Sequence, residues 1–261
     1  MLQKKVKVLV LRTAGINCDA ELVTAWEQAG AAPDLRHVNE IIAQPILLAD
    51  YAILSIPGGF AYGDDLGAGK LMANDLIYRL KEPFSRFVEV GKPVLGICNG
   101  FQVLVKAGLL GNVTLTANKS GQFECRWVWL ENVNSNKCLF TRGIERLHVP
   151  VAHGEGRLIV GGPDKAATLN QMQQAGRSVF KYIGADGSQP NYPHNPNGSD
   201  GQLAGICNEG GTVFGLMPHP ERFVTTLTDP RWMRSERPEG RQVGPGEGLK
   251  IFLNAVEYAA G

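Results

Sequence analysis

The chain has 261 residues, of which 44% are hydrophobic and 20% charged, values that are typical of a globular protein with a substantial core. Its 26 basic and 25 acidic residues leave a formal net charge of +1, which provides no electrostatic footprint for nucleic acid or for an anionic membrane. No apolar run reaches the roughly 18 residues that span a bilayer. We therefore expect small-molecule or protein partners, and neither nucleic acid nor a membrane.

The first hundred residues alternate between strand-like and helix-like segments. Strands are predicted at Val6–Leu11, Leu35–Val38, Tyr51–Ile56 and Pro93–Ile97. Helices are predicted after a cap at Asn17 or Asp19, and from about Leu71 to Val90 with an interruption near Pro83. Strands that alternate with helices form right-handed βαβ units and a parallel sheet, and ligands of such sheets lie at the carboxyl ends of the strands.

After Gly111 the pattern changes to short segments rich in aromatic and β-branched residues. Strands are predicted at Glu124–Glu131, Leu147–Ala152 and Ser178–Ile183, with a hairpin formed by Gln202–Cys207 and Thr212–Met217. The segments 184–201 and 228–246 have the composition of loops, and Gly248–Ala260 has the pattern of an amphipathic helix. The fold class is thus α/β with antiparallel additions in the second half, and we expect a single domain over residues 1–261.

Cysteine and histidine usage bears on location and metals. The five cysteines are scattered, odd in number and without a CxxC pair, which fits a reducing cytosol and predicts a cytoplasmic protein. The amino terminus resembles a signal peptide only superficially, because its apolar stretch is short and Arg12 interrupts it. The five histidines show neither HxxxH nor HExxH spacing, so we expect no metal site.

The most informative stretch is PVLGICNGFQVLVKAG, residues 93–108. An apolar strand runs into Gly96-Ile97-Cys98-Asn99-Gly100 and a helical pattern follows, which matches the nucleophile elbow G-x-S-x-G with cysteine in place of serine. The flanking glycines make room for a strained turn, and the helix amino terminus favours a thiolate at Cys98. The backbone N–H of Asn99 can then bind an oxyanion. Cysteines are more often buried small hydrophobes, so the strand–turn–helix context carries this interpretation.

A cysteine nucleophile usually needs a histidine that a third group orients. Two segments offer a histidine and a glutamate two positions apart, namely His153-Gly-Glu155 and His219-Pro-Glu221. In the second segment prolines stiffen the backbone on both sides of His219, so we predict His219 as the base and Glu221 as its partner. The first segment is rich in glycine and predicts a ligand-facing loop residue at His153. A His–Glu pair on its own is more often a surface ion pair.

A second glycine-rich turn, Pro57-Gly58-Gly59-Phe60, follows a buried strand and should lie at the same sheet edge as Cys98. An N–H at Gly59 is therefore a candidate second oxyanion donor. The continuation AYGDDLGAGKLM does not match a phosphate loop, because Asp64 occupies the first glycine position and Leu71 the Ser/Thr position. With no GxGxxG fingerprint either, we expect no cofactor in this chain.

Seven segments in order resemble one enzyme family over nearly the whole chain. They are GINCD at 15–19, PGGFAYGD at 57–64, GICNGFQ around Cys98, PVAHGEGR at 150–157, NPNGS at 195–199, MPHPER at 217–222 and GLKIF in the last helix. They resemble the class I (triad) glutamine amidotransferases and, among them, the glutaminase components of phosphoribosylformylglycinamidine synthases. The resemblance implies a three-layer fold with a central, mostly parallel sheet and helices on both faces.

The resemblance also implies roles for residues that match the family's motifs. Cys98 would attack the side-chain amide of glutamine, forming a thioester and releasing ammonia, while His219 moves the proton and Glu221 orients His219. The remaining implied roles are an oxyanion hole at Gly59 and Asn99, glutamine binding at Gln102 and Phe101, and an interface or substrate loop at His153 and Glu155.

Ammonia would pass to a synthetase subunit, in some complexes joined by a small accessory subunit. That partner would use Mg-ATP to convert formylglycinamide ribonucleotide into the amidine of de novo purine biosynthesis. The segment 228–246 and the NYPHNPNGS loop resemble the amidotransferase part of the large single-chain synthases more than the compact subunits. Because Met1 lies just before the first strand, we nevertheless expect a separate subunit.

Three alternatives share parts of this pattern. A cysteine hydrolase of the DJ-1/protease-like group has the elbow and the fold, but usually lacks a downstream HPE segment such as MPHPER. A non-catalytic subunit that only completes a complex would not need all three triad residue types. An amidotransferase of another pathway would use the same chemistry, and the PGGFAYGD and AHGEGR segments argue against it.

Overall fold

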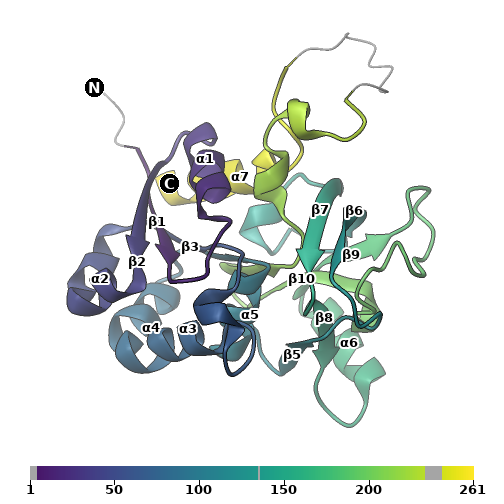
Figure 1. Cartoon of the computed structure of the whole chain (residues 1–261), viewed down its shortest axis with the longest axis horizontal. Coiled ribbons are helices and arrows are strands. Elements are labelled where there is room, and N and C mark those ends of the chain that lie inside the picture. Colours follow the sequence, from purple (N-terminus) through teal and green to yellow (C-terminus); the bar gives the residue numbers. More distant parts are fainter. Residues whose placement is uncertain (1–4, 135, 233–242) are drawn as a thin grey trace.

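The computed structural model describes residues 5–134, 136–232 and 243–261 (Figure 1). The strands in these ranges are β1 (Lys7–Arg12), β2 (Ala32–His37), β3 (Ile53–Ile56), β4 (Val94–Ile97), β5 (Val113–Thr116), β6 (Glu124–Asn132), β7 (Arg146–His153), β8 (Arg157–Val160), β9 (Ser178–Ile183), β10 (Leu203–Cys207) and β11 (Val213–Leu216). The helices are α1 (Asp19–Gln28), α2 (Val38–Ala43), α3 (Lys70–Asn74), α4 (Lys81–Glu89), α5 (Asn99–Lys106), α6 (Lys165–Gln174) and α7 (Leu249–Ala260). A membrane-spanning helix is not found among the described residues.

A nine-stranded sheet runs through the described part of the chain in the order β2-β1-β3-β4-β11-β10-β9-β6-β7. Neighbouring strands pair in parallel from β2 to β11 and antiparallel from β11 to β7. Helices α1 and α7 pack together over one face, and α3 and α5 cover the other (Figure 1). The predicted α/β class, with a parallel core, helices on both faces and antiparallel additions in the second half, is confirmed.

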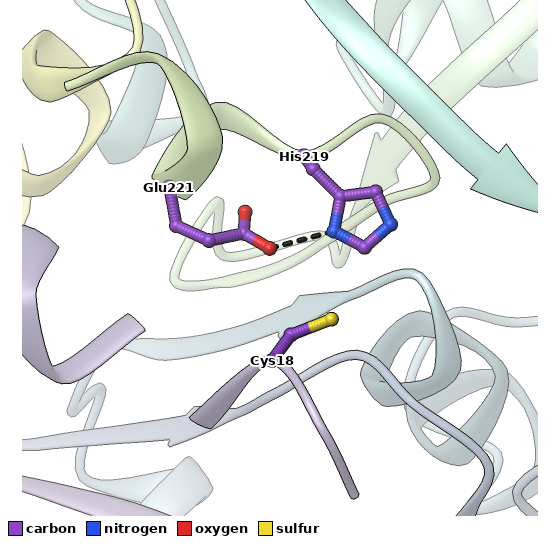
Figure 2. A group of neighbouring side chains, drawn as sticks. All are labelled: Cys18, His219 and Glu221. Atoms are coloured by element: carbon purple, nitrogen blue, oxygen red, sulfur yellow. Dashed lines mark hydrogen bonds and ion pairs between the residues drawn. The ribbon is translucent and has the colours of Figure 1, made fainter. Parts of the chain in front are cut away.

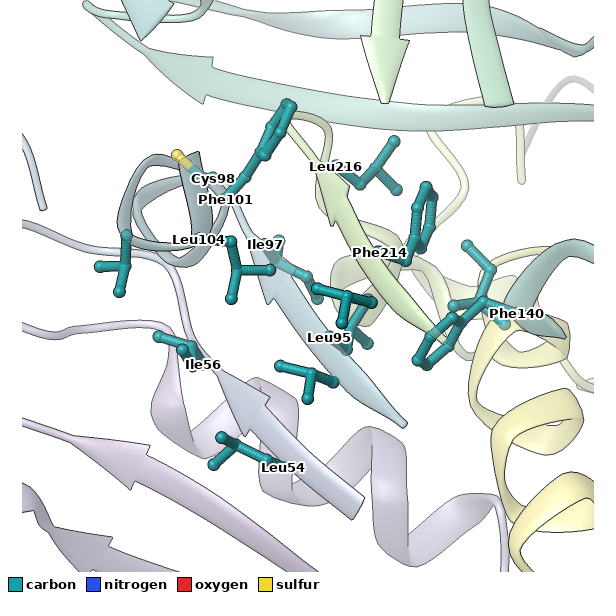
Figure 3. Packing of buried hydrophobic residues seen from close by; sticks show 14 of the residues in the cluster. Leu54, Ile56, Leu95, Ile97, Cys98, Phe101, Leu104, Phe140, Phe214 and Leu216 are labelled. Atoms are coloured by element: carbon teal, nitrogen blue, oxygen red, sulfur yellow. The ribbon is translucent and has the colours of Figure 1, made fainter. Parts of the chain in front are cut away.

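The centre of the sheet is buried on both faces. All residues of β3 and β4 are buried, including the polar residue Ser55, as the mostly apolar sequences of strands covered by helices on either side require. Figure 3 shows how Leu54 and Ile56 of β3 and Leu95 and Ile97 of β4 pack in one continuous cluster. This cluster holds the strand that leads to Cys98, so the position of the sulfur depends on the buried centre of the sheet.

The strand β11 joins the two halves of the sheet. The predicted hairpin with β10 is present, with Gly205 opposite Leu216. On its other side, however, β11 pairs in parallel with β4, with Leu216 opposite Ile97, which the sequence reading did not anticipate. Because parallel strands end at the same sheet edge, the segments that follow β4 and β11 emerge side by side. This pairing brings together two motifs far apart in the sequence.

Several local predictions need correction. The helix α1 begins at Asp19 with Cys18 at the capping position and no side-chain cap, so neither predicted cap residue is used. The predicted interruption of the helical stretch near Pro83 is present, and the break lies at Leu80; Pro83 itself lies in the first turn of α4, where proline's missing N–H leaves no bond unmade. The sequence reading also missed α2, α6 and a second sheet of β5 and β8. Of the predicted loop at 228–246, residues 233–242 lie outside the described residues.

Candidate active site

Cys98 occupies a strained turn between β4 and α5. Its φ of 52° and ψ of −106° are unusual for a residue with a side chain. The turn requires the flanking glycines, because a Cβ at Gly96 would lie 2.5 Å from the Gly100 oxygen and one at Gly100 would lie 2.1 Å from the Ile56 oxygen. The structure therefore has the backbone geometry of a nucleophile elbow. Asn99 is the first residue of α5, so its N–H is one of the helix's unsatisfied amino-terminal donors.

The Cys98 thiol faces a pocket of about 350 Å³ at the carboxyl edge of the sheet. In Figure 3 its sulfur points away from the packed apolar side chains, and it lies 3.7 Å from the Ala152 oxygen. The pocket is also lined by Gly59, Gln102, His153, Glu155 and His219. Gly59 has a φ of 135°, and a Cβ there would lie 2.7 Å from the Asn17 nitrogen, so the second glycine-rich turn also excludes a side chain.

His219 and Glu221 form a buried pair above this pocket. The imidazole Nδ1 lies 2.6 Å from Glu221 Oε1, and both side chains are 1% exposed (Figure 2). His219 follows β11, its N–H donates to the Pro150 oxygen at 2.8 Å, and Pro220 begins a short 3₁₀ helix, Pro220–Phe223. The pair was expected from an extended segment, but the 3₁₀ turn is what brings Glu221 back to the imidazole.

The environment of His219 favours the imidazolium. Burial alone would lower the pKa of His219, but the adjoining Glu221 carboxylate and the Cys98 sulfur outweigh it, and the pKa is raised well above its usual value. An imidazolium near a cysteine supports the thiolate. His219 Nε2 is buried and has no hydrogen-bond partner within the described residues, so it remains available for proton transfer. Gly58 separates the two side chains: a Cβ there would lie 2.9 Å from His219 Cε1 and 3.4 Å from Cys98 Cβ.

The side chain of Asn99 organises the floor of the pocket. Its Oδ1 accepts a hydrogen bond from the Ala61 N–H at 3.0 Å, and its Nδ2 donates to Asp64 Oδ1 at 3.0 Å and to Gln102 Oε1 at 2.8 Å. Gln102 Nε2 in turn donates to the backbone carbonyl oxygen of Glu155 at 2.6 Å. Burial raises the pKa of Asp64, which also lines the pocket. Only the backbone N–H of Asn99 was predicted to have a role, and the hydrogen bonds of its side chain were not predicted.

His153 was predicted to be a ligand-facing loop residue, and this is wrong in part. It is the last residue of β7, 3% exposed, and its Nδ1 lies 3.1 Å from Asn118 Oδ1. Burial lowers its pKa to about 3, with a smaller contribution from His219, so the ring is neutral. His153 nevertheless lines the pocket, as does the exposed residue Glu155. These two residues are thus close to Cys98 without belonging to the His219 pair.

Phe101 does not join the pocket residues. Its side chain is fully buried, and it packs so closely on β11 that a Cβ at Gly215 would lie 2.0 Å from its ring (Figure 3). The Phe101 side chain therefore belongs to the core, and the predicted contact of this side chain with glutamine is wrong. Gln102, one position further along α5, is the residue that turns to the pocket.

Cys18 was not predicted as a site residue, yet it lies beside the His219 pair (Figure 2). It is 2% exposed, and the Arg222 guanidinium donates to its sulfur from Nη2 at 3.1 Å. Both residues line the same pocket as Cys98. The only sequence signal for Cys18 is its place in GINCD, since no spacing rule connects it to a histidine some 200 residues later.

Comparison with known proteins identifies the family. Residues 5–259 match the model of the CobB/CobQ-like glutamine amidotransferase domain. A protein of Dehalococcoides mccartyi named phosphoribosylformylglycinamidine synthase subunit PurQ is 48% identical, over 98% of this chain and 98% of its own length. A protein of the same name from Methanococcus maripaludis is 40% identical, over 97% of each chain.

A solved structure agrees with these relatives. A chain of the PurLQS structure from Thermotoga maritima superposes with a TM-score of 0.74 at 32% identity, covering 98% of this chain and 99% of that one. The matches span both the elbow around Cys98 and the segment that carries His219. The chain therefore belongs to the PurQ family of phosphoribosylformylglycinamidine synthase subunits, within the glutamine amidotransferases.

Proposed function

We propose that this chain hydrolyses glutamine and supplies the ammonia for formylglycinamidine ribonucleotide synthesis in purine biosynthesis. The observation that carries the proposal is the convergence of the Cys98 elbow and the buried His219–Glu221 pair on one pocket. That convergence is the arrangement of nucleophile, base and orienting carboxylate that acyl transfer requires. The PurQ relatives, which are named as subunits of this synthase, support the choice of pathway.

In the proposed reaction the Cys98 thiolate attacks the side-chain amide carbon of glutamine. The carbonyl oxygen gains the negative charge, and the N–H groups of Gly59 and Asn99 stabilise it. His219 then delivers a proton to the amide nitrogen, the C–N bond breaks and ammonia leaves the thioester. Water, deprotonated by His219, attacks the thioester, and glutamate departs as the thiol reforms.

The surrounding residues have supporting roles in the same proposal. Glu221 holds the imidazole so that Nε2 faces the reaction. Gln102 binds glutamine, and its own contacts with Asn99 and the Glu155 oxygen keep its amide in place. We assign His153 no step of the reaction; its neutral ring lines the pocket. Removing one oxyanion donor typically costs about 10²–10³ in rate, so these backbone positions matter as much as side chains.

The proposal includes the partners. A synthetase subunit receives the ammonia and uses Mg-ATP, together with a small accessory subunit, in line with the PurLQS assembly of Thermotoga maritima. This chain would carry no cofactor of its own and would act as one amidotransferase domain over residues 1–261. A cytoplasmic location is part of the same proposal and is supported by free cysteines throughout the described residues.

The test is a comparison of two nitrogen sources in the assembled synthase. Cys98→Ala should abolish amidine formation from glutamine, with a loss of at least about 10³-fold, because the other thiol that lines the pocket, Cys18, does not lie on the elbow before α5. Formation from added ammonium should persist, because the synthetase does not need Cys98. Cys125→Ala, which removes an exposed thiol, is the matched control and should retain both activities.

Two outcomes would contradict the proposal. Loss of the ammonium-dependent reaction in a correctly assembled Cys98→Ala complex would show that the two activities are not divided between subunits in this way. Unchanged glutamine-dependent activity would show that Cys98 is not the nucleophile. A glutaminase assay also separates an amidotransferase from a DJ-1/protease-like hydrolase, which would not release ammonia from glutamine.

A further inference from the structure

Three side chains of different chemistry meet beside the Cys98 pocket. The Cys18 sulfur, a ring nitrogen of His219 and a carboxylate oxygen of Glu221 all lie within 4.8 Å of one another. Figure 2 shows the sulfur of Cys18 approaching the imidazole from the side of α1, with Glu221 across from it. All three residues are at most 3% exposed. The reaction proposed above uses His219 and Glu221 but has no role for Cys18.

Two polar atoms of the same side chains have no partner of their own in the described part of the chain. Glu221 Oε2 and His219 Nε2 are buried and have no hydrogen-bond partner within the described residues. A buried carboxylate oxygen without a partner is costly, and a cation would stabilise it. This observation is independent of the proximity of the three side chains and points in the same direction. The cluster therefore offers three different donor groups, and one oxygen of Glu221 is unpartnered among the described residues.

The donor set fits one class of metal ion. A thiolate sulfur, an imidazole nitrogen and a carboxylate oxygen are the protein ligands of zinc, and sites with three protein ligands keep a fourth position open. Zinc–ligand bonds of about 2.0–2.3 Å place the ligand atoms about 3–4 Å apart. The Cys18 sulfur lies within 4.8 Å of the other two ligand atoms and would have to approach them to this range, whereas the His219 Nδ1 to Glu221 Oε1 contact of 2.6 Å would have to open by about 1 Å.

The charges balance when a divalent cation binds. A thiolate at Cys18, the Glu221 carboxylate and a neutral imidazole together carry two negative charges, which match the two positive charges of the ion. Arg222 stays outside this set. Its Nη2 donates to the Cys18 sulfur and its Nε lies 3.6 Å from Glu21 Oε1, so its charge already has a carboxylate partner. A ligand that also accepts an outer hydrogen bond is common in metal sites.

We propose that Cys18, His219 and Glu221 bind a single Zn²⁺ ion that switches off the glutaminase reaction. The ion takes the place of the proton between His219 and Glu221 and displaces the thiol proton of Cys18. His219 then no longer exchanges protons at the pocket, so metal binding and catalysis exclude each other. The proposed binding rests on the proximity and the donor chemistry of the three side chains, while the inhibitory consequence rests on the proposed function of His219.

The binding test uses the full chain with Cys98→Ala, which removes the competing thiol and leaves the three proposed ligands in place. Co²⁺ serves as a spectroscopic probe, because a cobalt–thiolate bond gives a charge-transfer absorption band. We expect one Co²⁺ per chain, displaced by Zn²⁺. Adding Cys18→Ser should abolish the band and weaken Zn²⁺ binding by at least about 100-fold, since even outer-shell changes cost 10–100-fold.

Cys125→Ser in the same Cys98→Ala background is the matched control, because it removes an exposed thiol outside the cluster. It should leave the band and the Zn²⁺ affinity unchanged, and thermal unfolding should show that all variants are folded. A band that survives Cys18→Ser, or one that disappears with Cys125→Ser, would overturn the proposed ligand set. So would the absence of tight binding to the Cys98→Ala protein.

The inhibition test uses the assembled synthase. Zn²⁺ should suppress the glutamine-dependent reaction but spare the ammonium-dependent one, and Cys18→Ser should raise the Zn²⁺ concentration for half-inhibition at least tenfold. Equal inhibition of the parent and Cys18→Ser enzymes would assign the effect to Cys98 and would contradict inhibition through the Cys18 cluster. Because the cobalt measurement requires no turnover, binding can hold even if the proposed glutaminase activity fails, and the two failures are distinguishable.

Discussion

Gly58 shows how a missing side chain can shape the candidate active site. A Cβ at this position would approach His219 Cε1 to 2.9 Å, the Cys18 sulfur to 3.2 Å and Cys98 Cβ to 3.4 Å. The first distance is shorter than Cβ contacts in proteins normally are, so the imidazole would have to move. The spacing between nucleophile and base therefore depends on the absence of one methyl group.

We predict that Gly58→Ala lowers kcat for glutamine by about 10²-fold, because a displacement on the order of 1 Å in a catalytic group costs about that much. The unfolding midpoint should fall as well, since Gly58 is buried and the added methyl group would crowd the buried side chains of His219 and Cys18. Steady-state glutaminase kinetics and thermal unfolding of the same preparation would measure both effects.

Gly210→Ala supplies the control for this substitution, because its new Cβ would make no contact closer than 3.6 Å. Its kinetics should match those of the parent protein. If Gly58→Ala retained full turnover, the imidazole would have room to move without loss of geometry, and the tight spacing described here would not govern the reaction.

Residue by residue, the sequence predicted which residues meet at the pocket better than it predicted the contacts of their neighbours. Cys98, His219 and Glu221, to which we assign the proposed chemistry, lie in short motifs with a defined local geometry. Phe101 and Gln102 were treated alike because they are adjacent, but consecutive helical residues point about 100° apart, so one meets the core and the other the pocket. A sequence motif does not specify the direction in which each of its side chains points.

At the scale of elements, the elbow depends on how closely α5 approaches β3. A Cβ at Gly100 would lie 2.1 Å from the Ile56 oxygen, a backbone atom that cannot rotate away. Alanine is the better helix former by about 1 kcal/mol, which would favour the substitution in an isolated helix. Overpacking in a dense core costs about 1–3 kcal/mol, and a contact with backbone lies at the upper end. The cost of the steric contact should therefore outweigh the gain in helix propensity.

Gly100→Ala should therefore lower the free energy of unfolding by about 2 kcal/mol and reduce glutaminase activity, because α5 carries both Asn99 and Gln102. Denaturant unfolding at constant m-value would give the first quantity. A stability equal to or above that of the parent protein would mean that α5 shifts freely and that helix propensity outweighs the contact.

The same scale shows why the order of strands was only partly predictable. The alternating first half gave β1, β3 and β4 directly, and the turn NEGG gave the hairpin of β10 and β11. The pairing of β11 with β4 joins segments about 120 residues apart and depends on tertiary packing, which no local periodicity encodes. The site residues could therefore be named from motifs, while the reason they meet needed the structure.

Across the whole molecule, His148 couples the far end of the sheet to the carboxyl-terminal segment. The His148 ring packs against Trp129 at 4.5 Å and Trp127 at 5.1 Å between centroids. The backbone N–H of His148 donates to Glu247 Oε2 at 2.8 Å. Burial, with a smaller contribution from Arg231, lowers the pKa of His148 to about 4. The folded protein thus holds this imidazole neutral at pH values where an exposed one is charged.

This shift makes stability depend on pH in a definite direction. In the unfolded chain the pKa of His148 returns to its ordinary value of about 6.5. Below that pH the unfolded state therefore binds a proton, which the folded state binds only near pH 4. The stabilisation is fully present above pH 6.5 and is lost as the pH falls from there towards 4. Between pH 7 and pH 5 the loss from this one group is on the order of 1–2 kcal/mol.

We predict that His148→Phe, which keeps an aromatic ring in the stack but cannot titrate, makes unfolding less sensitive to acid. The difference in unfolding free energy between pH 7 and pH 5, measured with denaturant at each pH, should shrink by about 1–2 kcal/mol relative to the parent protein. His194→Gln changes an exposed histidine and should leave that difference unaltered. Equal acid sensitivity in His148→Phe and the parent would mean that other groups, among them the buried His153, carry the effect.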